Sequence, residues 1–368
     1  MKYLFFVQSD GRGHLSQALA LQEKLEKRGH EVVGAVIGVS PDYVVPEFFK
    51  EQINAPLFFI ASPTFIKDKK NQGVKIFKSA LKAVWHLPAY IASLKKIKKI
   101  VDKLKPDALI NFYEPIAGNY FRFYRKTLPM FCIAHQHFVE HPFSRWPKIS
   151  RLAKMSFKLY NRLTSPRRTF RIALSFAAAG DQKDKKLFIV PPLIREAIKN
   201  QKPSTGDYIL VYLLNHGYSE KINALSQAHP ELKIEAFWDQ PVAKITPVGP
   251  NLNFHPLSGQ KFIDYLANCR AYVSTSGFDS VAEAAYLQKE ILLVPTKNHF
   301  EQKCNAFDAA RGGLAVAAED FDENALLKLE KNRQSEAARD GHKAFKAWVD
   351  NYDYKIINIL ENIKPTDA

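Results

Sequence analysis

The sequence predicts an α/β protein of two domains, each with a parallel β-sheet covered by helices on both faces. Its 368 residues exceed what one ordinary hydrophobic core accommodates. Two successive series of short apolar segments alternate with stretches of helical spacing, and strands that alternate with helices pair in parallel. A polar stretch that contains proline and glycine, NQKPSTGD at residues 200–207, separates the two series and predicts a linker.

The apolar segments define the expected elements of each half. Leucines at helical spacing over residues 16–28, followed by Gly29, predict a first helix between two strands. Strands are expected at residues 2–7, 31–37, 57–60, 107–112 and 130–134, and then at 208–214, 233–237, 252–255, 271–274 and 291–294. We therefore expect an N-terminal domain over 1–200, a C-terminal domain over 206–336, and one C-terminal helix, 337–368, that can pack back on the N-terminal domain.

The cysteines and the hydropathy of the chain indicate where in the cell the protein works. Cys132, Cys269 and Cys304 lie far apart and form neither a CxxC pair nor a disulfide framework, which is typical of a reducing cytosol. The first apolar stretch, residues 3–7, is too short for a signal peptide. No run reaches the roughly 18 apolar residues of a transmembrane helix. A cytoplasmic location is expected.

The net charge of +16 is concentrated in two segments. Residues 65–105 carry 12 lysines and 2 aspartates, and residues 145–171 carry 9 basic residues and no acidic one. Within them, residues 75–105 and 146–170 have the spacing of basic amphipathic helices, which lie on anionic membrane surfaces. A solvated helix face over an ordinary core explains the same spacing. Nucleic acid is not expected as a partner, because no RNP, KH or zinc-finger motif accompanies the charge.

A glycine-rich turn follows the first predicted strand. Gly11, Arg12 and Gly13 stand where backbone N–H groups and a helix N-terminus are suited to an anion or a polar ligand. His14 comes next, and an imidazole can take a proton from a hydroxyl near neutral pH. Capping or packing at the turn is the alternative. The turn lacks the third glycine of GxGxxG, which argues against a dinucleotide cofactor.

A second polar constellation lies in the C-terminal half. Ser276 and Gly277 form a turn between a strand and a helix, where hydroxyls and free N–H groups suit phosphate. Glu283 lies about one turn into that helix and can accept bonds from two vicinal sugar hydroxyls. A helix cap and a solvated glutamate are the alternatives. Three more polar side chains follow the next strand, at the sheet edge where doubly wound folds bind ligands: His299, Glu301 and Gln302.

Two further patterns raise the question of a metal. The run Asp320-Phe321-Asp322 resembles the Asp-x-Asp of metal-dependent transferases, but its setting before a helical stretch predicts an N-cap. His135, His137 and His141 cluster with Gln136, and their spacing matches neither HExxH nor a standard zinc pattern. Part of an acceptor site is the preferred interpretation of this cluster. No metal is expected.

Several stretches together resemble the GT-B glycosyltransferases, in particular the group with the lipid II-forming N-acetylglucosaminyltransferase and the UDP-glycosyltransferases. They are GRGHLSQALALQEKLEKRGHEV, DALINFYEP with PMFCIAHQH, and GFDSVAEAAYLQKEILLVP with HFEQKCNA. The resemblance covers nearly the whole chain and implies an α/β fold of two Rossmann-like domains facing across a cleft. The chain departs from the family at residues 288–290, where Gln-Lys-Glu replaces the usual Gly-Lys-Pro.

The resemblance also implies roles for the site residues. His14 would be the general base, Glu114 would orient it or act as the base itself, and Gly11, Arg12 and Gly13 would shape the acceptor-side loop. The donor side would bind diphosphate, ribose and sugar through six residues: Ser276, Gly277, Glu283, His299, Glu301 and Gln302. No cofactor is implied, because the nucleotide sugar is a co-substrate.

We therefore expect a metal-independent, inverting glycosyltransferase that moves a sugar from a UDP-sugar to an acceptor hydroxyl. The basic segments fit a lipid-linked or cell-envelope acceptor and peripheral association with the inner face of the membrane. Two alternatives stay open. A nucleotide-sugar 2-epimerase shares the fold, although its Gly-Thr-Arg-Pro-Glu pattern is absent. A non-catalytic protein that binds a nucleotide sugar or a membrane is the other.

Overall fold

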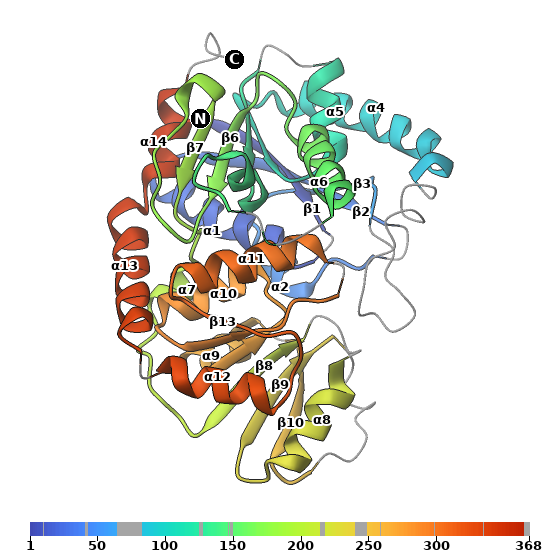
Figure 1. Cartoon of the computed structure of the whole chain (residues 1–368). Helices are drawn as coiled ribbons and strands as arrows, with labels where there is room; N and C mark the ends of the chain where they lie inside the picture. The colour runs from blue at the N-terminus through green and yellow to red at the C-terminus, as the bar shows by residue number, and fades with distance from the viewer. Residues whose placement is uncertain are drawn as a thin grey trace. The chain divides into compact units, whose positions relative to one another are not determined.

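In a computed structural model, the chain folds into two compact units. The structure describes residues 1–9, 11–40, 43–64, 83–124, 128–145, 147, 150–213, 218–239, 249–257, 259–297, 299–333 and 335–363. The first unit takes in the described residues from Met1 to Arg195 together with those from Tyr352 onward, and the second runs from Glu196 to Asn351. Each unit contains one parallel sheet (Figure 1).

The first unit contains a seven-stranded sheet in the order β3-β2-β1-β4-β5-β6-β7. All of its strand pairs are parallel. The strands in chain order are β1 (Lys2–Gln8), β2 (Glu31–Val39), β3 (Leu57–Ala61), β4 (Ala108–Phe112), β5 (Met130–Ile133), β6 (Phe170–Leu174) and β7 (Leu187–Val190). The order reverses between β1 and β4, so the loops after these two strands diverge and leave room for a ligand at the carboxyl edge.

Helices cover both faces of this sheet (Figure 1). Leu4 and Phe6 of β1 pack in one core cluster with residues of α4 and α5, and the intervening Phe5 is equally buried toward the opposite face. This continuous burial explains why the strand is apolar from Tyr3 to Val7. The helices are α1 (Gly13–Lys27), α2 (Glu47–Gln52), α4 (Leu87–Leu104), α5 (Pro115–Phe123), η1 (His135–Glu140), α6 (Arg151–Thr164), η2 (Lys183–Lys185) and α14 (Lys355–Asn362).

The second unit contains a six-stranded parallel sheet in the order β10-β9-β8-β11-β12-β13. Its strands are β8 (Tyr208–Leu213), β9 (Lys233–Trp238), β10 (Leu252–Pro256), β11 (Ala271–Ser274), β12 (Glu290–Leu293) and β13 (Val316–Ala317). Its helices are α7 (Glu196–Lys199), α8 (Ser219–Ala228), α9 (Gly259–Asn268), α10 (Phe278–Tyr286), α11 (Phe300–Arg311), α12 (Glu323–Arg333) and α13 (Glu336–Tyr352). The switch in strand order falls between β8 and β11.

The ten expected strands are confirmed, most to within a residue or two at each end. Three strands were not expected: β6, β7 and β13. The basic helix predicted over residues 146–170 includes Phe170, the first residue of β6, so this prediction is wrong at its C-terminal end. Helix α6 stops at Thr164, because Pro166 cannot continue a helix and disfavours helical geometry in the residue before it.

The boundary between the units falls between Arg195 and Glu196, earlier than the expected linker at residues 200–207. That stretch is anchored to the end of α9 in the second unit. The Ser204 N–H donates to Ala267 O at 3.0 Å, and the Gly206 N–H donates to Asn268 O at 2.8 Å. The polar composition of residues 200–207 thus correctly predicted a segment without helix or strand, but hydrogen bonds to α9 make it part of the second unit.

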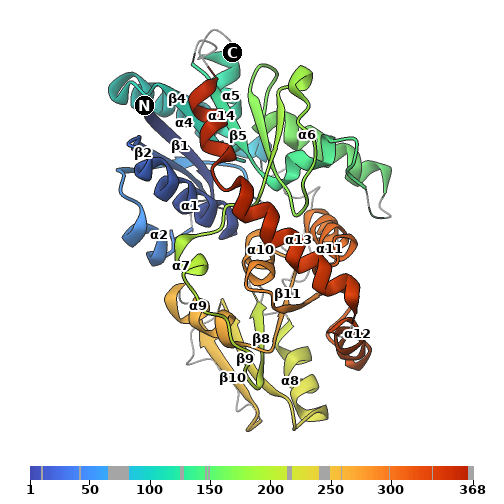
Figure 2. The same cartoon turned by 90° about the vertical axis from the view of Figure 1, so that its left-hand side faces the viewer.

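The C-terminal segment is two helices and not one. Helix α13 belongs to the second unit except at its last residue, and α14 belongs to the first (Figure 2). The break at residues 353–354 places Asp353 beside α1, where its Oδ1 lies 2.6 Å from the ammonium of Lys24. Arg28 of α1 donates to Asn358 of α14 at 3.3 Å. These polar contacts dock the end of the chain on the first helix.

The two basic segments form the described helices α4 and α6. Residues 65–82, Trp146, Lys148 and Ile149 lie outside the described residues. Helix α4 turns Ile97 and Ile100 into the core and leaves Ile91 exposed. On α6, Met155 and Leu159 are exposed. No helix in the described parts of the chain is long and apolar enough to cross a membrane.

Candidate functional site

The first group of candidate residues lies at the carboxyl edge of the first sheet. The chain leaves β1 through Ser9, whose Oγ donates to Gly38 O at the end of β2 at 2.5 Å. Gly11 then adopts a φ of +97°, a backbone conformation that favours glycine, and helix α1 begins at Gly13. Among the described residues, no side chain caps helix α1 at its N-cap, Arg12. The N-terminus of α1 thus follows β1 closely, at the sheet edge where open α/β folds bind ligands.

His14 stands in the first turn of α1 and is half-buried. Its Nδ1 lies 3.2 Å from Gln17 Oε1, and its ring centroid lies 5.6 Å from that of Tyr113, which follows β4. The switch between β1 and β4 therefore brings the turn and the β4 loop together. Arg12 places its guanidinium 4.4 Å from the centre of the Phe48 ring, which fixes the turn against α2.

Glu114 is the buried N-cap of helix α5. Its Oε2 accepts from the Ala117 N–H at 2.6 Å, and its Oε1 accepts from the Ser62 hydroxyl. Gly38 is required here, since a Cβ at that position would lie 2.8 Å from Glu114 Oε1. Burial raises the pKa of Glu114 to about 7, against the opposing effect of the Ser62 and Ala117 hydrogen bonds. With no exposed surface and both oxygens bonded, Glu114 caps α5, and its role as a base stays a prediction.

Tyr113 organises an aromatic cluster that the sequence analysis missed. It has a φ of +62°, a strained conformation for a non-glycine residue, and such strain gathers at functional sites. Its hydroxyl donates to Asn161 Oδ1 of α6. Its ring centroid lies 5.3 Å from that of Tyr160 and 5.9 Å from that of His137. The only sequence signal was its place directly after β4, next to Glu114.

The histidine cluster after β5 separates into structural and unpartnered members. His135 Nδ1 contacts Leu174 O at 2.7 Å, and His141 Nε2 contacts Gly180 O at 2.8 Å. His137 is fully buried, and within the described residues neither of its ring nitrogens has a hydrogen-bond partner. Burial, assisted by the positive charges of Arg171 and His14, lowers the pKa of His137 to about 3. The neutral ring keeps one donor and one acceptor beside the His14–Tyr113 pair.

The second group lies at the carboxyl edge of the second sheet, after β11. Ser276 has a φ of +67° and is fully buried, and its Oγ has no partner among the described residues. Gly277 is the N-cap of α10 and carries no side chain that could block the first N–H groups of the helix. Asn305 of α11 donates to Ser276 O at 3.0 Å, while its Oδ1 is also unpartnered in the described structure. The Ser276 hydroxyl, which can donate, thus stands beside the N-terminus of α10, an arrangement that suits an anion.

The other donor-side candidates occupy α10 and the start of α11. Glu283 is buried on α10, less than two turns from Gly277. His299 caps α11 through its Nδ1, which accepts from the Gln302 N–H at 3.4 Å. Gln302 Oε1 accepts from the Thr296 N–H at 2.8 Å and closes the loop after β12. Glu301 is half-buried in the first turn of α11. The same unit thus contains all six predicted donor residues, and Ser276 is linked to α11 through Asn305.

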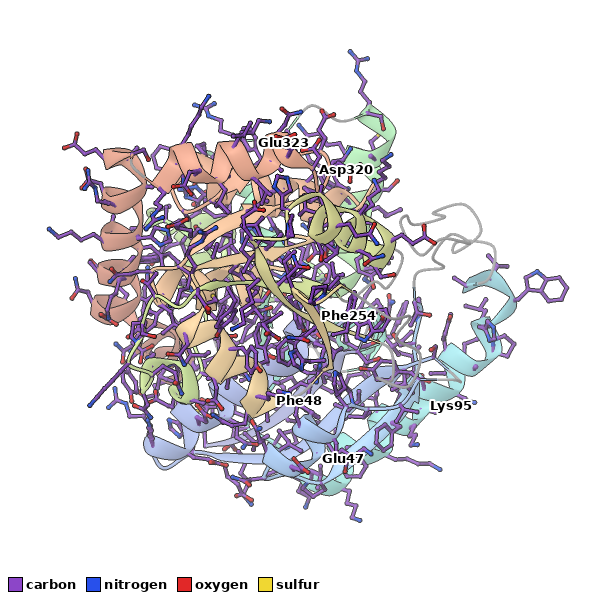
Figure 3. The ribbon with its side chains drawn as sticks, turned by 90° about the horizontal axis from the view of Figure 1, so that it is seen from below. Glu47, Phe48, Lys95, Phe254, Asp320 and Glu323 are labelled. Carbon is purple, nitrogen blue, oxygen red and sulfur yellow. The ribbon has the colours of Figure 1, made fainter. Side chains whose placement is uncertain are left out.

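The structure explains the turn at Gln288 and Lys289 and the run from Asp320 to Asp322. Gln288, where the resembled pattern has glycine, adopts a φ of +55°. The next residue, Lys289, is buried and donates to Ser204 O at 2.5 Å and to Cys269 O at 3.1 Å, which holds the turn. The predicted N-cap before α12 is confirmed, because Asp322 Oδ1 accepts from the Ala325 N–H at 2.9 Å. Its neighbour Asp320, labelled in Figure 3, pairs with Lys221.

Comparison with known proteins assigns the family. The profile of the family described as "Glycosyl transferase family 1" matches residues 1–332. The chain belongs to this family. It is a glycosyltransferase. An uncharacterized glycosyltransferase of Methanosarcina acetivorans is 24% identical to it in an alignment of 335 residues, and the match covers 83% of this chain and 82% of that protein.

Solved structures of glycosyltransferases share the fold of this family member. The glycotransferase of kitacinnamycin superposes with a TM-score of 0.64 at 13% identity and 98% coverage of both chains. The spinosyn rhamnosyltransferase SpnG, complexed with thymidine diphosphate, superposes with a TM-score of 0.61 at 12% identity, over 98% of this chain and all of that one. These likenesses identify the two parallel-sheet units as the two Rossmann-like domains of the GT-B fold.

Proposed function

We propose that this glycosyltransferase moves a sugar from a nucleotide-sugar donor, a UDP-sugar, to the hydroxyl of an acceptor, with inversion and without a catalytic metal. The observation that carries the donor assignment is the buried turn at Ser276, whose hydroxyl has no partner among the described residues and stands at the N-terminus of α10 beside Asn305. An anion there gains the helix dipole and the N–H groups of the first turn. The SpnG structure holds thymidine diphosphate, a chemically similar ligand.

The acceptor would bind in the first unit. His14, half-buried at the sheet switch point, is the group that would take the proton from the attacking hydroxyl. Gly11, Arg12 and Gly13 shape the loop in front of it. His137, whose ring nitrogens have no partner in the described structure, supplies a donor and an acceptor beside it. Since one base is in evidence, a single displacement with inversion of the anomeric carbon is proposed. The leaving diphosphate would be stabilised by the N–H groups of α10.

The remaining donor contacts follow from their placement around α10. Glu283 would accept bonds from the ribose hydroxyls, and Glu301 and Gln302, beyond the cap formed by His299, would face the donor sugar. These four residues stand on the helices that follow β11 and β12, the strand ends where open α/β sheets bind ligands.

A panel of nucleotide sugars tests this proposal. Binding and slow donor hydrolysis would be measured for the wild type, Ser276→Ala, Glu283→Ala and His14→Ala. We expect the first two variants to lose donor affinity and His14→Ala to keep affinity but lose turnover. Ser280→Ala, one turn further along α10, is the matched control, because it removes a hydroxyl that donates to Gly277 O at 3.2 Å. Millimolar donors that fail to bind the wild type would refute the proposal.

The acceptor is proposed to be lipid-linked, with the protein held at the cytoplasmic face of an anionic membrane. Support comes first from the start of α4, where Trp85, just before the helix, is 80% exposed and Leu87 and Ile91 are also exposed. Exposed lysines farther along the helix, including Lys95, add positive charge (Figure 3). A basic helix with exposed aromatic and aliphatic residues is suited to the headgroup region. Sedimentation with phosphatidylglycerol vesicles, lost in Trp85→Asp and at high salt, is the expected result.

A further inference from the structure

Tyr113 adopts a backbone conformation that is unfavourable for an aromatic residue. It directly follows β4, its φ is +62°, and it is only 6% exposed. A left-handed backbone at a bulky residue persists only where surrounding contacts hold it, and residues of this kind gather at active sites. The surroundings of Tyr113 must therefore supply the contacts that fix it.

Asn161 of α6 supplies the polar contact that fixes the Tyr113 side chain. Asn161 is fully buried. Its Oδ1 accepts from the Tyr113 hydroxyl, and its Nδ2 donates to Gln136 O at 3.1 Å. Both ends of the amide are thus used, and they join the segment after β4 to the segment after β5. An aliphatic side chain of similar size could make neither bond, and an ionised aspartate would lack the donor.

The end of α6 that carries Asn161 is itself anchored to its neighbours. Asn111 of β4 donates through its Nδ2 to Thr164 O at 2.8 Å. Helix α5 packs so closely on this end that a Cβ at Gly118 would lie 2.0 Å from Leu163 O. The position of Asn161 is therefore set by contacts with β4 and α5, so this residue can act as a fixed support.

The ring of Tyr113 in turn packs beside His14. The two ring centroids lie 5.6 Å apart, with an angle of 33° between the ring planes. His14 Nδ1 lies 3.2 Å from Gln17 Oε1, so the imidazole is held both at one nitrogen and through its contact with the tyrosine ring. Because the tyrosine hydroxyl is bonded to Asn161, a change at Asn161 would displace the ring that packs on the histidine.

We infer that Asn161 is a positioning residue for His14 and acts through Tyr113. The inference rests on the proposed function for the role of His14 as the base, whereas the placement of the imidazole can be measured without a donor. A reacting group that is misplaced by about 1 Å can lose about a hundredfold in rate. Loss of the support is therefore expected to lower turnover and to leave donor affinity unchanged, because the proposed donor contacts all stand in the second unit.

Nuclear magnetic resonance of the full chain, labelled at histidine Cε1, measures the placement of the imidazole. His14→Ala identifies the His14 signal. We expect that signal to move in Asn161→Leu, which removes both bonds of the amide, and in Tyr113→Phe, which keeps the ring but removes its anchor. Tyr113→Phe leaves the bond from Asn161 to Gln136 O in place and carries the test if Asn161→Leu does not fold. A His14 signal that is unchanged in the folded variants would overturn the inference.

Turnover is the second readout of the same variants. For slow hydrolysis of the UDP-sugar that binds the wild type, kcat should fall about 10- to 100-fold in each single variant, with KM unchanged. The double variant should lose no more than the larger single loss, since both changes break one interaction. Losses that add in full would contradict the claim that Asn161 acts through Tyr113.

Tyr208→Phe is the matched control, because it also removes a hydrogen-bonded tyrosine hydroxyl, which donates to Tyr265 O at 2.8 Å in the second unit. It should change neither the His14 signal nor kcat. Urea unfolding measures the stability of each variant, and a kcat for Tyr113→Phe equal to that of the control would show a merely structural role and overturn the inference. Turnover retained by His14→Ala would instead refute the base assignment of the proposed function, and the His14 signal, read without a donor, distinguishes the two failures.

Discussion

Replacing Glu114 by glutamine is expected to change the pH dependence of stability and to leave catalysis in place. The carboxyl group is fully buried as the cap of α5, and burial raises its pKa from 4.5 to about 7. A carboxyl with a raised pKa contributes its full stability below the unfolded value and loses it as the pH rises through the folded value. The stability of the wild type should therefore decline between about pH 4.5 and pH 7 through this group.

The magnitude follows from the size of the shift. One pKa unit corresponds to about 1.4 kcal/mol, so the rise to about 7 corresponds to about 3 kcal/mol of unfolding free energy. Glutamine stays neutral at every pH and can still accept from the Ala117 N–H. The stability of Glu114→Gln relative to the wild type should thus increase by about 3 kcal/mol between pH 4.5 and pH 8.

Urea unfolding at pH 4.5, 6, 7 and 8, followed by circular dichroism, measures this difference. Glu47→Gln is the matched control, because Glu47 also stands at the start of a helix but its side chain is 70% exposed. It controls for the general effect of removing one carboxylate. Parallel stability curves for Glu114→Gln and the wild type would refute the burial argument.

Activity provides the second readout of the same variant. As a cap that does not touch the reacting atoms, Glu114 can be replaced by glutamine with sugar transfer retained within about threefold, since the cap geometry survives. A loss of a hundredfold or more, with stability intact, would instead make Glu114 the base, as the sequence resemblance allows.

Three further changes test other parts of the structure. Asp353→Leu should cost about 3 to 5 kcal/mol in urea unfolding, because the buried Lys24 ammonium loses its carboxylate, and the double variant with Lys24→Met should recover most of it. A single variant that costs less than 1 kcal/mol contradicts this. Gln288→Gly should raise stability by up to about 1 kcal/mol, since glycine adopts the φ of +55° without strain, and unchanged thermal unfolding argues otherwise. Asn305→Asp should weaken donor binding in calorimetry more than Asn305→Ala, because a carboxylate would face the diphosphate; equal losses would place the anion elsewhere.

The fold class and much of the candidate site were predictable from local patterns. Buried parallel strands are short apolar runs, and helices between them have their own period, so ten strands could be located from the sequence. Turn chemistry is equally local: Gly11 marked the turn after β1, and Asp322 marked a helix cap. Two of the three missed strands are short, since β7 has four residues and β13 two, but length alone does not explain this, because β5, β11 and β12 also have four residues and were predicted.

What only the tertiary structure decided depends on contacts between residues far apart in the chain. The sequence places Glu114 after a strand, but its role follows from Ser62 and Gly38, which enclose it, because burial sets both its pKa and its access to substrate. The pairing of Asp353 with Lys24 of α1 likewise joins residues far apart in the chain, and no single stretch encodes it. Periodicity determines elements, whereas strand order determines which side chains share a site.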